Sequence, residues 1–190
     1  MSGVASATPR RIGLLGGSFD PIHNAHLQLA QSACSELALD AVWFIPAGQP
    51  WQRDPLAASP QQRWDMVNLA IAGRTGLRAC DIELKRQGPS YTIDTLAALR
   101  QRHPDIEFSL ILGTDIRAER TRWKRFEEIE RDYSIHWIGR LGHDPEGQGL
   151  ILPDISSREV RRRLAAGEDV SAFVPQRVLT LVRQSGYLFE

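Results

Sequence analysis

The stretch IGLLGGSFDPIHNAH, residues 12–26, decides the fold of this chain. Its first four residues form a short apolar run, which predicts a buried β-strand. The strand leads through Gly16 and Gly17 into a segment where apolar residues recur every three to four positions. That spacing predicts a helix over residues 24–39. A strand that passes directly into a helix through a glycine turn is the unit from which parallel α/β sheets are built.

Three later apolar runs have the same character. They are short, contain β-branched or aromatic residues and are followed by Gly or Pro, which predicts buried strands at residues 41–45, 108–112 and 135–138. Helical patterns lie between them. The tetrapeptide Ser59-Pro60-Gln61-Gln62 predicts a helix start, because it combines a capping box with proline at the first helical position. Residues 92–102 predict another helix.

The C-terminal third of the chain completes the pattern. We interpret the polar, glycine-rich residues 141–149 as a surface loop and expect two short helices at residues 157–165 and 175–184, which close the C-terminal end against the sheet. The alternation of strands and helices predicts the α/β class, with a single Rossmann-like, doubly wound parallel sheet. Its ligand site should lie beyond the carboxyl ends of the strands. We expect residues 1–10 to be extended or disordered and residues 11–190 to form the one domain.

The composition fits a globular domain and argues against several function classes. The 190 residues are 42% apolar and 24% charged, and 23 Lys and Arg balance 23 Asp and Glu. No overall charge therefore attracts nucleic acid or an anionic membrane. Cys34 and Cys80 are not spaced as a disulfide framework or a zinc site. Because neither a signal peptide nor an apolar run of about 20 residues is visible, we expect a cytoplasmic protein without nucleic-acid or membrane partners.

The glycines and histidines of the opening stretch predict a phosphate site. Two glycines after a strand let the backbone approach a phosphate, and the helix start offers free N–H groups. His23 and His26 are three residues apart, so both imidazoles can point into one crevice. There they could donate hydrogen bonds to phosphate oxygens during an in-line displacement. In the alternative interpretation one histidine caps the helix and the other is a surface residue, but the glycine turn and the strand favour the phosphate site.

The run GGSFDPIHNAH, residues 16–26, resembles the signature of the nucleotidylyltransferase superfamily, G-G-[ST]-F-D-P-x-H-x-G-H. The sequence departs from it at Ala25, where the superfamily usually has glycine. The resemblance implies that His23 and His26 are catalytic. It also implies that the beginning of the motif binds ATP, through Gly16, Gly17, Ser18 and Phe19.

A second stretch, ISSREVR at residues 155–161, resembles the distal phosphate site of the same superfamily, I-S-S-T-x-[IV]-R. Arg158 stands where the superfamily usually has threonine. Ser156 and Glu159 have the spacing of a capping box, which predicts that a helix begins here.

This resemblance implies that Ser156 and Ser157 bind ATP and that Arg161 is catalytic. A guanidinium binds phosphates through paired, charge-assisted hydrogen bonds and would stabilise the leaving pyrophosphate. The consecutive arginines at residues 161–163 cannot all face one way. We single out Arg161, because it lies one helical turn beyond the serines. The alternative is a basic, solvent-exposed helix.

The segment GPSYTIDTL, residues 88–96, resembles the P-S-Y-T-x-x-T-L element of nicotinate-nucleotide adenylyltransferases and narrows the family. The resemblance implies that Ser90, Tyr91 and Thr92 bind the mononucleotide, with the helix-start N–H groups on the nicotinate carboxylate. It further implies that Trp123 stacks on the pyridine ring. An isolated tryptophan more often packs in a core, but the charged neighbours of Trp123 argue against deep burial.

Two further segments resemble the sequence pattern of this family, although some of their residues differ from it. The interval from Gly113-Thr114-Asp115 to Trp123 resembles the family's G-x-D to W interval and implies that Asp115 binds ATP. The loop IPAGQPWQR, residues 45–53, resembles I-P-x-x-x-P-P-H-K, although its last three residues differ. The resemblance implies that Arg53 meets the phosphate of the mononucleotide. Lys124 follows the tryptophan where the family commonly has an aromatic residue.

The resemblances together imply adenylyl transfer from ATP to nicotinate mononucleotide, giving deamido-NAD and pyrophosphate in NAD biosynthesis. The mononucleotide phosphate attacks directly, so no side chain acts as a covalent nucleophile. Mg²⁺ is expected as cofactor, held mainly by the ATP phosphates and water, with no metal site made by the protein. The alternatives are a phosphopantetheine adenylyltransferase, a cytidylyltransferase or a nucleotide-binding sensor without catalysis. The sequence leaves open whether nicotinate or nicotinamide mononucleotide is preferred. It also leaves open whether the protein is a monomer or a homo-oligomer.

Overall fold

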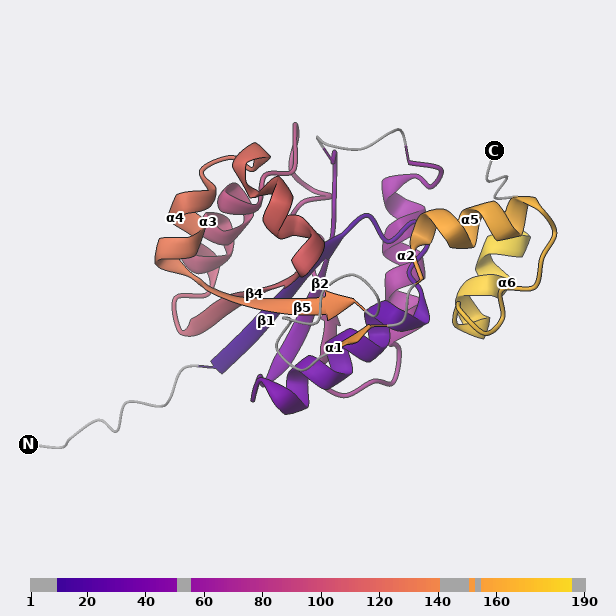
Figure 1. Cartoon of the computed structure of the whole chain (residues 1–190), viewed down its shortest axis with the longest axis horizontal. Helices are drawn as coiled ribbons and strands as arrows, with labels where there is room; N and C mark the ends of the chain where they lie inside the picture. Colours follow the sequence, from indigo (N-terminus) through magenta and orange to yellow (C-terminus); the bar gives the residue numbers. More distant parts are fainter. Residues whose placement is uncertain (1–9, 51–55, 141–150, 153–154, 186–190) are drawn as a thin grey trace, which may run out of the picture.

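The computed structural model describes residues 10–50, 56–140, 151–152 and 155–185. These residues form a six-stranded sheet in the order β3-β2-β1-β4-β5-β6, and every neighbouring pair is parallel (Figure 1). The strands are β1 (Arg10–Gly17), β2 (Ala41–Pro46), β3 (Leu77–Ala79), β4 (Ile106–Gly113), β5 (Ser134–Arg140) and β6 (Ile151–Leu152).

Helices alternate with these strands along the chain. They are α1 (Asn24–Glu36), α2 (Pro60–Ile71), α3 (Thr92–Arg102), the 3-10 helix η1 (Thr114–Arg122), α4 (Phe126–Asp132), α5 (Ser157–Ala165) and α6 (Gln176–Gln184). Helices α1 and α2 join strands on one side of β1, and α3 then returns the chain to β4 on its other side. The strand order therefore reverses between β1 and β4, and ligands of doubly wound sheets bind outside the carboxyl ends of strands at such a point.

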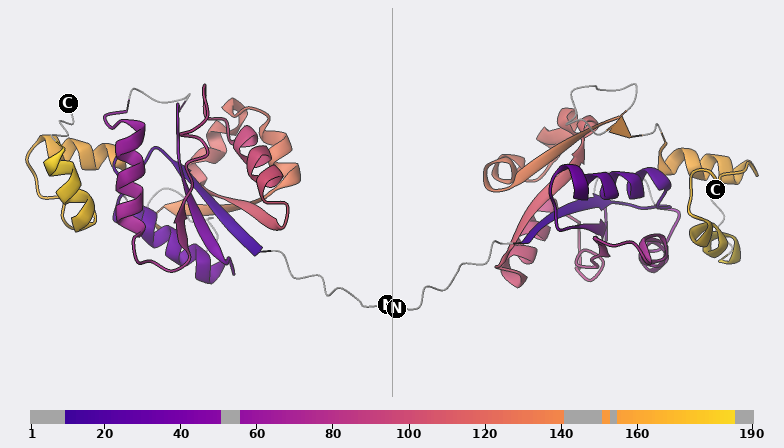
Figure 2. Two further views of the ribbon diagram at one scale, coloured as in Figure 1. Left: turned by 180° about the vertical axis from the view of Figure 1, so that it is seen from behind. Right: turned by 90° about the horizontal axis from the view of Figure 1, so that it is seen from below.

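Helices cover both faces of the sheet, which gives the molecule two apolar cores (Figure 2). Along β1, Ile12 and Leu14 belong to the core under α3 and α4, whereas Leu15 belongs to the core under α1 and α2. Each fully buried aliphatic side chain of this kind contributes about 1.5–3 kcal/mol. Gly13 is needed for the packing of this second core, since a Cβ there would lie 2.7 Å from Leu39 Cδ1 and 2.8 Å from Ile111 Cδ1.

The predicted doubly wound parallel sheet is confirmed, and all four predicted strands are present with longer bounds. The sequence analysis missed β3 and β6, which have three and two residues. It also missed η1 and α4. The first helix ends at Glu36 rather than at residue 39, because Ala38 has a φ of 49° and reverses the chain. The predicted loop at residues 141–149 and nearly all of the N-terminal segment lie outside the described residues.

The two C-terminal helices form where the sequence predicts them, but they pack differently. Helix α5 has the predicted bounds, and α6 begins one residue later because Pro175 is its N-cap. We expect both helices to pack against the sheet. Instead α6 contacts α2, at the right-hand side of the molecule in Figure 1. The contact forms through apolar side chains, because Val174, Val178 and Val182 join the core under α1 and α2.

Two properties predicted from composition can be examined in the structure. Among the residues described, no helix is both long and apolar enough to cross a bilayer. Cys34 and Cys80 are free thiols, both partly buried, and burial raises the pKa of each. Neither thiol therefore has the lowered pKa of a reactive cysteine.

Candidate active site

The turn after β1 is fixed by a buried carboxylate. Asp20 is 0% exposed, and its Oδ2 and Oδ1 accept hydrogen bonds from the backbone N–H groups of Ala57 (2.9 Å) and Ala58 (3.1 Å). Phe19, with a φ of 50°, packs its ring under Gly17, where a Cβ would lie 3.1 Å from the ring. A Cβ on the exposed Gly16 would meet no described atom within 4 Å. The open side of the turn is therefore at Gly16.

His23 and His26 share one face at the start of α1. Their rings stack with centroids 3.7 Å apart and an interplanar angle of 24°, and the Phe19 and His26 rings form a T-shaped pair with centroids 5.1 Å apart. His23 is the N-cap, and its backbone N–H donates to Nδ1 of His26 at 3.3 Å. An accepting Nδ1 places the proton of the neutral ring on Nε2. The pair thus caps the helix and also gives His26 a donor nitrogen on the opposite side of its ring.

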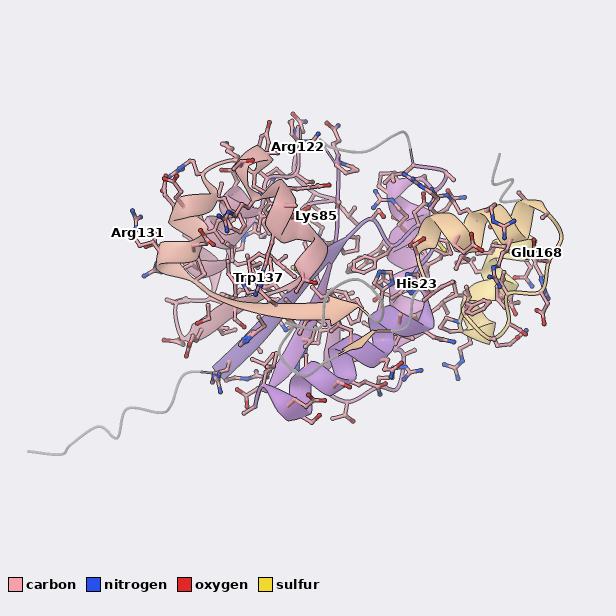
Figure 3. All side chains as sticks on the ribbon, in the orientation of Figure 1. His23, Lys85, Arg122, Arg131, Trp137 and Glu168 are labelled. Carbon is pink, nitrogen blue, oxygen red and sulfur yellow. The ribbon has the colours of Figure 1, made fainter. Side chains whose placement is uncertain are left out.

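The second motif packs directly on this turn. Nη1 of Arg161 donates to the carbonyl oxygen of Asp20 at 2.6 Å and lies 3.6 Å from its Oδ2. The Ser157 hydroxyl donates to the carbonyl oxygen of Pro21 at 2.9 Å. These contacts join positions 141 and 136 residues apart in the sequence. In Figure 3, His23 lies on the side of the molecule where α5 and α6 are drawn, whereas Arg131 lies on the opposite side.

Glu159 decides which of the three consecutive arginines reaches the turn. Its carboxylate accepts from Arg162 Nε and Nη2 at 2.9 and 3.0 Å and from Arg163 Nε at 2.7 Å. These hydrogen bonds lower the pKa of Glu159 to about 2. Ser156 is the N-cap of α5 and accepts from the Glu159 backbone N–H at 3.2 Å, so that half of the predicted capping box is present. The Glu159 side chain is directed to Arg162 and Arg163, and of the three arginines it is Arg161 that donates to the first motif.

The segment that resembles the mononucleotide site is attached to the loop after β2. Ser90 Oγ accepts from the backbone N–H groups of Gly48 (2.9 Å) and Gln49 (3.2 Å), and Ser90 N–H donates to the Gln49 carbonyl at 2.9 Å. Gly48 has no space for a side chain, because a Cβ would lie 2.3 Å from the Glu83 carbonyl oxygen. The Ser90 hydroxyl thus holds the two loops together.

Tyr91 and Thr92 lie at the start of α3, and Trp123 lies on a neighbouring segment. Tyr91 is the N-cap, Thr92 is the first helical residue, and both are half-buried. Trp123 is half-buried with its ring edge-on to Phe126 at 5.6 Å. Lys124 links the segments, since its Nζ lies 4.6 Å from the centroid of the Tyr91 ring. The structure therefore brings the predicted carboxylate site and the predicted stacking residue to neighbouring segments.

Two predicted residues cannot be placed in this site. Arg53 and the side chain of Asp115 lie outside the described residues. A residue that the sequence analysis missed is Arg63, which is 1% exposed. Its Nη1 donates to the Ser18 carbonyl at 3.0 Å and its Nη2 to the Gly48 carbonyl at 3.4 Å, so it ties the turn after β1 and the loop after β2 to α2. The sequence signal that could have identified it is its position on the same apolar face of α2 as Val67.

Comparison with known proteins identifies the class to which this chain belongs. The family model described as "Cytidylyltransferase-like" matches residues 14–163, which contain both motifs. Among curated proteins, the chain is 42% identical to a probable nicotinate-nucleotide adenylyltransferase of Bordetella avium (93% of this chain, 97% of that protein). It is 37% identical to one of Shouchella clausii (92% and 95%). The chain belongs to the nicotinate-nucleotide adenylyltransferase family within the cytidylyltransferase-like class.

A solved structure shares the fold. Plasmodium falciparum nicotinic acid mononucleotide adenylyltransferase complexed with NaAD superposes with a TM-score of 0.81 over 95% of this chain and 98% of that chain. The two sequences are 19% identical, so this similarity concerns the fold alone.

Proposed function

We propose that the protein transfers an adenylyl group from ATP to nicotinate mononucleotide and forms deamido-NAD and pyrophosphate. The observation that carries the proposal is the contact between the two motifs. Arg161 and Ser157 bind the backbone of the turn at Asp20 and Pro21, only a few residues before His23. Donors suited to phosphate thus gather at the carboxyl end of β1, where a doubly wound sheet binds its ligand.

In the proposed reaction, a phosphate oxygen of the mononucleotide attacks the α-phosphorus of ATP. The new P–O bond forms while the bond from the α-phosphorus to the oxygen that bridges to the β-phosphorus breaks, and pyrophosphate leaves. Positioning of two anions and stabilisation of the developing charge supply the rate enhancement. The backbone beside Gly16 leaves space for a phosphate, and Nε2–H of His26 donates to its oxygens. The stacked His23 fixes the orientation of this ring.

Arg161 is assigned to the β- and γ-phosphates and to the pyrophosphate that leaves. Its hydrogen bond to the Asp20 carbonyl uses Nη1, and 28% of the side chain is exposed. Because the protein already orients the guanidinium, little side-chain entropy is lost when it binds a phosphate. Ser156 and Ser157 begin α5, so the first N–H groups of this helix face the same anion.

The mononucleotide is assigned to the start of α3. The N–H groups of the first helical turn at Thr92 favour the nicotinate carboxylate, and Trp123 offers a ring for the pyridine. Ser90 acts by holding the turn to the loop after β2. Arg53, the last residue of the IPAGQPWQR loop in the sequence, is proposed for the mononucleotide phosphate.

Mg²⁺ is proposed to arrive with ATP as part of the substrate. The described residues contain no group of three or more His, Cys, Asp or Glu side chains that could hold an ion. Mg²⁺ commonly keeps several waters and binds through substrate phosphates, where it neutralises charge. We further propose the cytoplasm as the site of the reaction, since the two thiols are free.

The proposed function is tested by incubating the purified protein with Mg²⁺, ATP or CTP, and one acceptor at a time. The acceptors are nicotinate mononucleotide, nicotinamide mononucleotide and phosphopantetheine, and the products are identified by mass. The expected products are deamido-NAD and pyrophosphate from ATP with nicotinate mononucleotide. A cytidylyl product, a phosphopantetheine product or ATP binding without pyrophosphate release would contradict the proposal.

A further inference from the structure

Lys124 connects the segment of Trp123 to the first turn of α3. Its Nζ lies 3.0 Å from Oδ2 and 3.4 Å from Oδ1 of Asp94, and 4.6 Å from the centroid of the Tyr91 ring. The ion pair is partly exposed, with 42% of the lysine side chain and 39% of the aspartate side chain accessible. The ammonium therefore contacts two residues of one helical turn at once.

Asp94 places a negative charge close to the proposed carboxylate site. It is the third residue of α3, two positions after Thr92. An aspartate in a first turn stabilises the helix, because it interacts with the positive end of the dipole. The same charge repels a second anion at that helix start, and a ligand carboxylate proposed for the Thr92 N–H groups is such an anion.

Lys124 is the cation that offsets this charge. The next residue, Arg125, acts on Asp94 only through longer-range charge, since its Nε and Nη2 donate to the Glu128 carboxylate. Since an ammonium 3.0 Å from a carboxylate cancels much of its field at longer range, the helix start regains its preference for an anion. An uncharged ligand at the same position would gain nothing from this cancellation.

We propose that Lys124 is a positioning residue that sets the preference of the pyridine pocket for a carboxylate over a carboxamide, by neutralising Asp94. This inference rests on the proposed function. It concerns a residue by which this chain differs from its family, and it separates two substrates that share every atom except those of the carboxyl or amide group.

The test compares kcat/KM for nicotinate and nicotinamide mononucleotides at saturating ATP. The variants are Lys124→Met, which keeps an unbranched stem without the charge, Lys124→Arg, Asp94→Asn and the double variant of Lys124→Met with Asp94→Asn. Lys85→Met is the matched control. Lys85 is the only other lysine of the chain and forms a comparable exposed pair with Asp81 at 2.7 Å.

Lys124→Met is expected to lower the acid-to-amide ratio of kcat/KM about threefold to fivefold, the size of effect that one exposed ion pair can have. Lys124→Arg and Lys85→Met should keep the wild-type ratio. The double variant should restore the ratio to within about twofold, because it removes both charges together. A merely structural role predicts equal losses for both mononucleotides and no recovery in the double variant, and either result overturns the proposal.

Titration calorimetry with each mononucleotide runs in parallel, so that the affinity ratio is obtained without turnover. A wild-type protein that binds the acid mononucleotide but forms no dinucleotide contradicts the proposed function, while the ratio still tests Lys124. An active wild-type protein whose Lys124→Met variant keeps both ratios contradicts the role of Lys124 alone.

Discussion

At the scale of single residues, the proposed chemistry depends on hydrogen-bond donors that the backbone holds in place. His26 is the clearest example, because its Nδ1 accepts from the N-cap N–H and its ring is stacked on His23. The sequence predicted that the two histidines share a face, since residues three apart on a helix do. It could not predict the direction of the ring, which depends on the β conformation of His23 at the N-cap.

The variant His26→Ala is expected to lower kcat by more than about tenfold, because one donor to the developing charge is lost. The fold should remain intact, since apolar packing under α1 does not use this imidazole. Steady-state kinetics with nicotinate mononucleotide and a urea unfolding curve measure the two effects. Gln28→Ala, at an exposed position of the same helix, is the control. A kcat equal to that of the wild type would remove His26 from the mechanism.

Two glycines allow function and packing to be separated. Gly48→Ala places a methyl 2.3 Å from the Glu83 carbonyl oxygen and should destabilise the protein by about 1–3 kcal/mol in urea unfolding. Gly16→Ala meets no described atom within 4 Å and should leave stability within about 0.5 kcal/mol. Its methyl instead enters the space proposed for the phosphates, so KM for ATP should rise about tenfold, equivalent to about 1.4 kcal/mol. An unchanged KM would mean that phosphates do not approach Gly16.

At the scale of elements, local sequence signals predicted helix starts better than short strands. Both halves of the capping box from Ser59 to Gln62 are present, with proline in the first turn. Strand β3 was missed because only Leu77 among its three residues is buried, so no apolar run marks it. Strand β6 pairs through just two residues, which is too short for any pattern.

The α5 helix shows how an element selects one functional side chain. Its three arginines are consecutive and so point in different directions, and in the structure Arg162 and Arg163 pair with Glu159 while Arg161 reaches the turn. Spacing from the serines favoured Arg161, but only the folded structure shows where this guanidinium binds. The hydrogen-bond partners of the Glu159 side chain could not be predicted from the sequence, because its spacing from Ser156 equally suits a complete capping box.

Glu159 also gives α5 a defined response to acid. The arginines lower the pKa of its carboxyl from 4.5 to about 2, so the charged form favours the folded state. This contribution is complete above pH 4.5 and is lost as the pH falls toward about 2. As the pH falls from 4.5 toward about 2, Glu159→Gln should therefore lose less stability than the wild type. The urea concentration at the midpoint of unfolding, followed across this pH range, measures the difference. Glu127→Gln, at an exposed site on α4, is the control, and parallel curves for wild type and Glu159→Gln would contradict the assignment.

At the scale of the whole molecule, the fold brings two motifs that lie far apart in the sequence together at the carboxyl end of β1. The alternation of strands and helices was enough to predict a doubly wound parallel sheet, but the order of its strands is seen only in the structure. The hydrogen bond from Arg161 to the Asp20 carbonyl spans 141 residues, and no local pattern encodes such a contact. The family resemblance supplied the expectation that both motifs serve one ligand, and the structure places them in contact.

The molecule has no net charge, so attraction of the substrates depends on local groups. The arginine at the turn, the starts of α1, α3 and α5, and the lysine that neutralises Asp94 are such groups. In the proposed mechanism their arrangement, rather than overall charge, attracts the two anionic substrates to a protein of zero net charge.

The most direct test of the central claim is a crystal structure of the protein with α,β-methylene ATP. The α-phosphate is expected at Nε2 of His26, and the β- and γ-phosphates at Arg161 and the start of α5. A triphosphate bound to only one of the two motifs, or at another surface of the molecule, would contradict it.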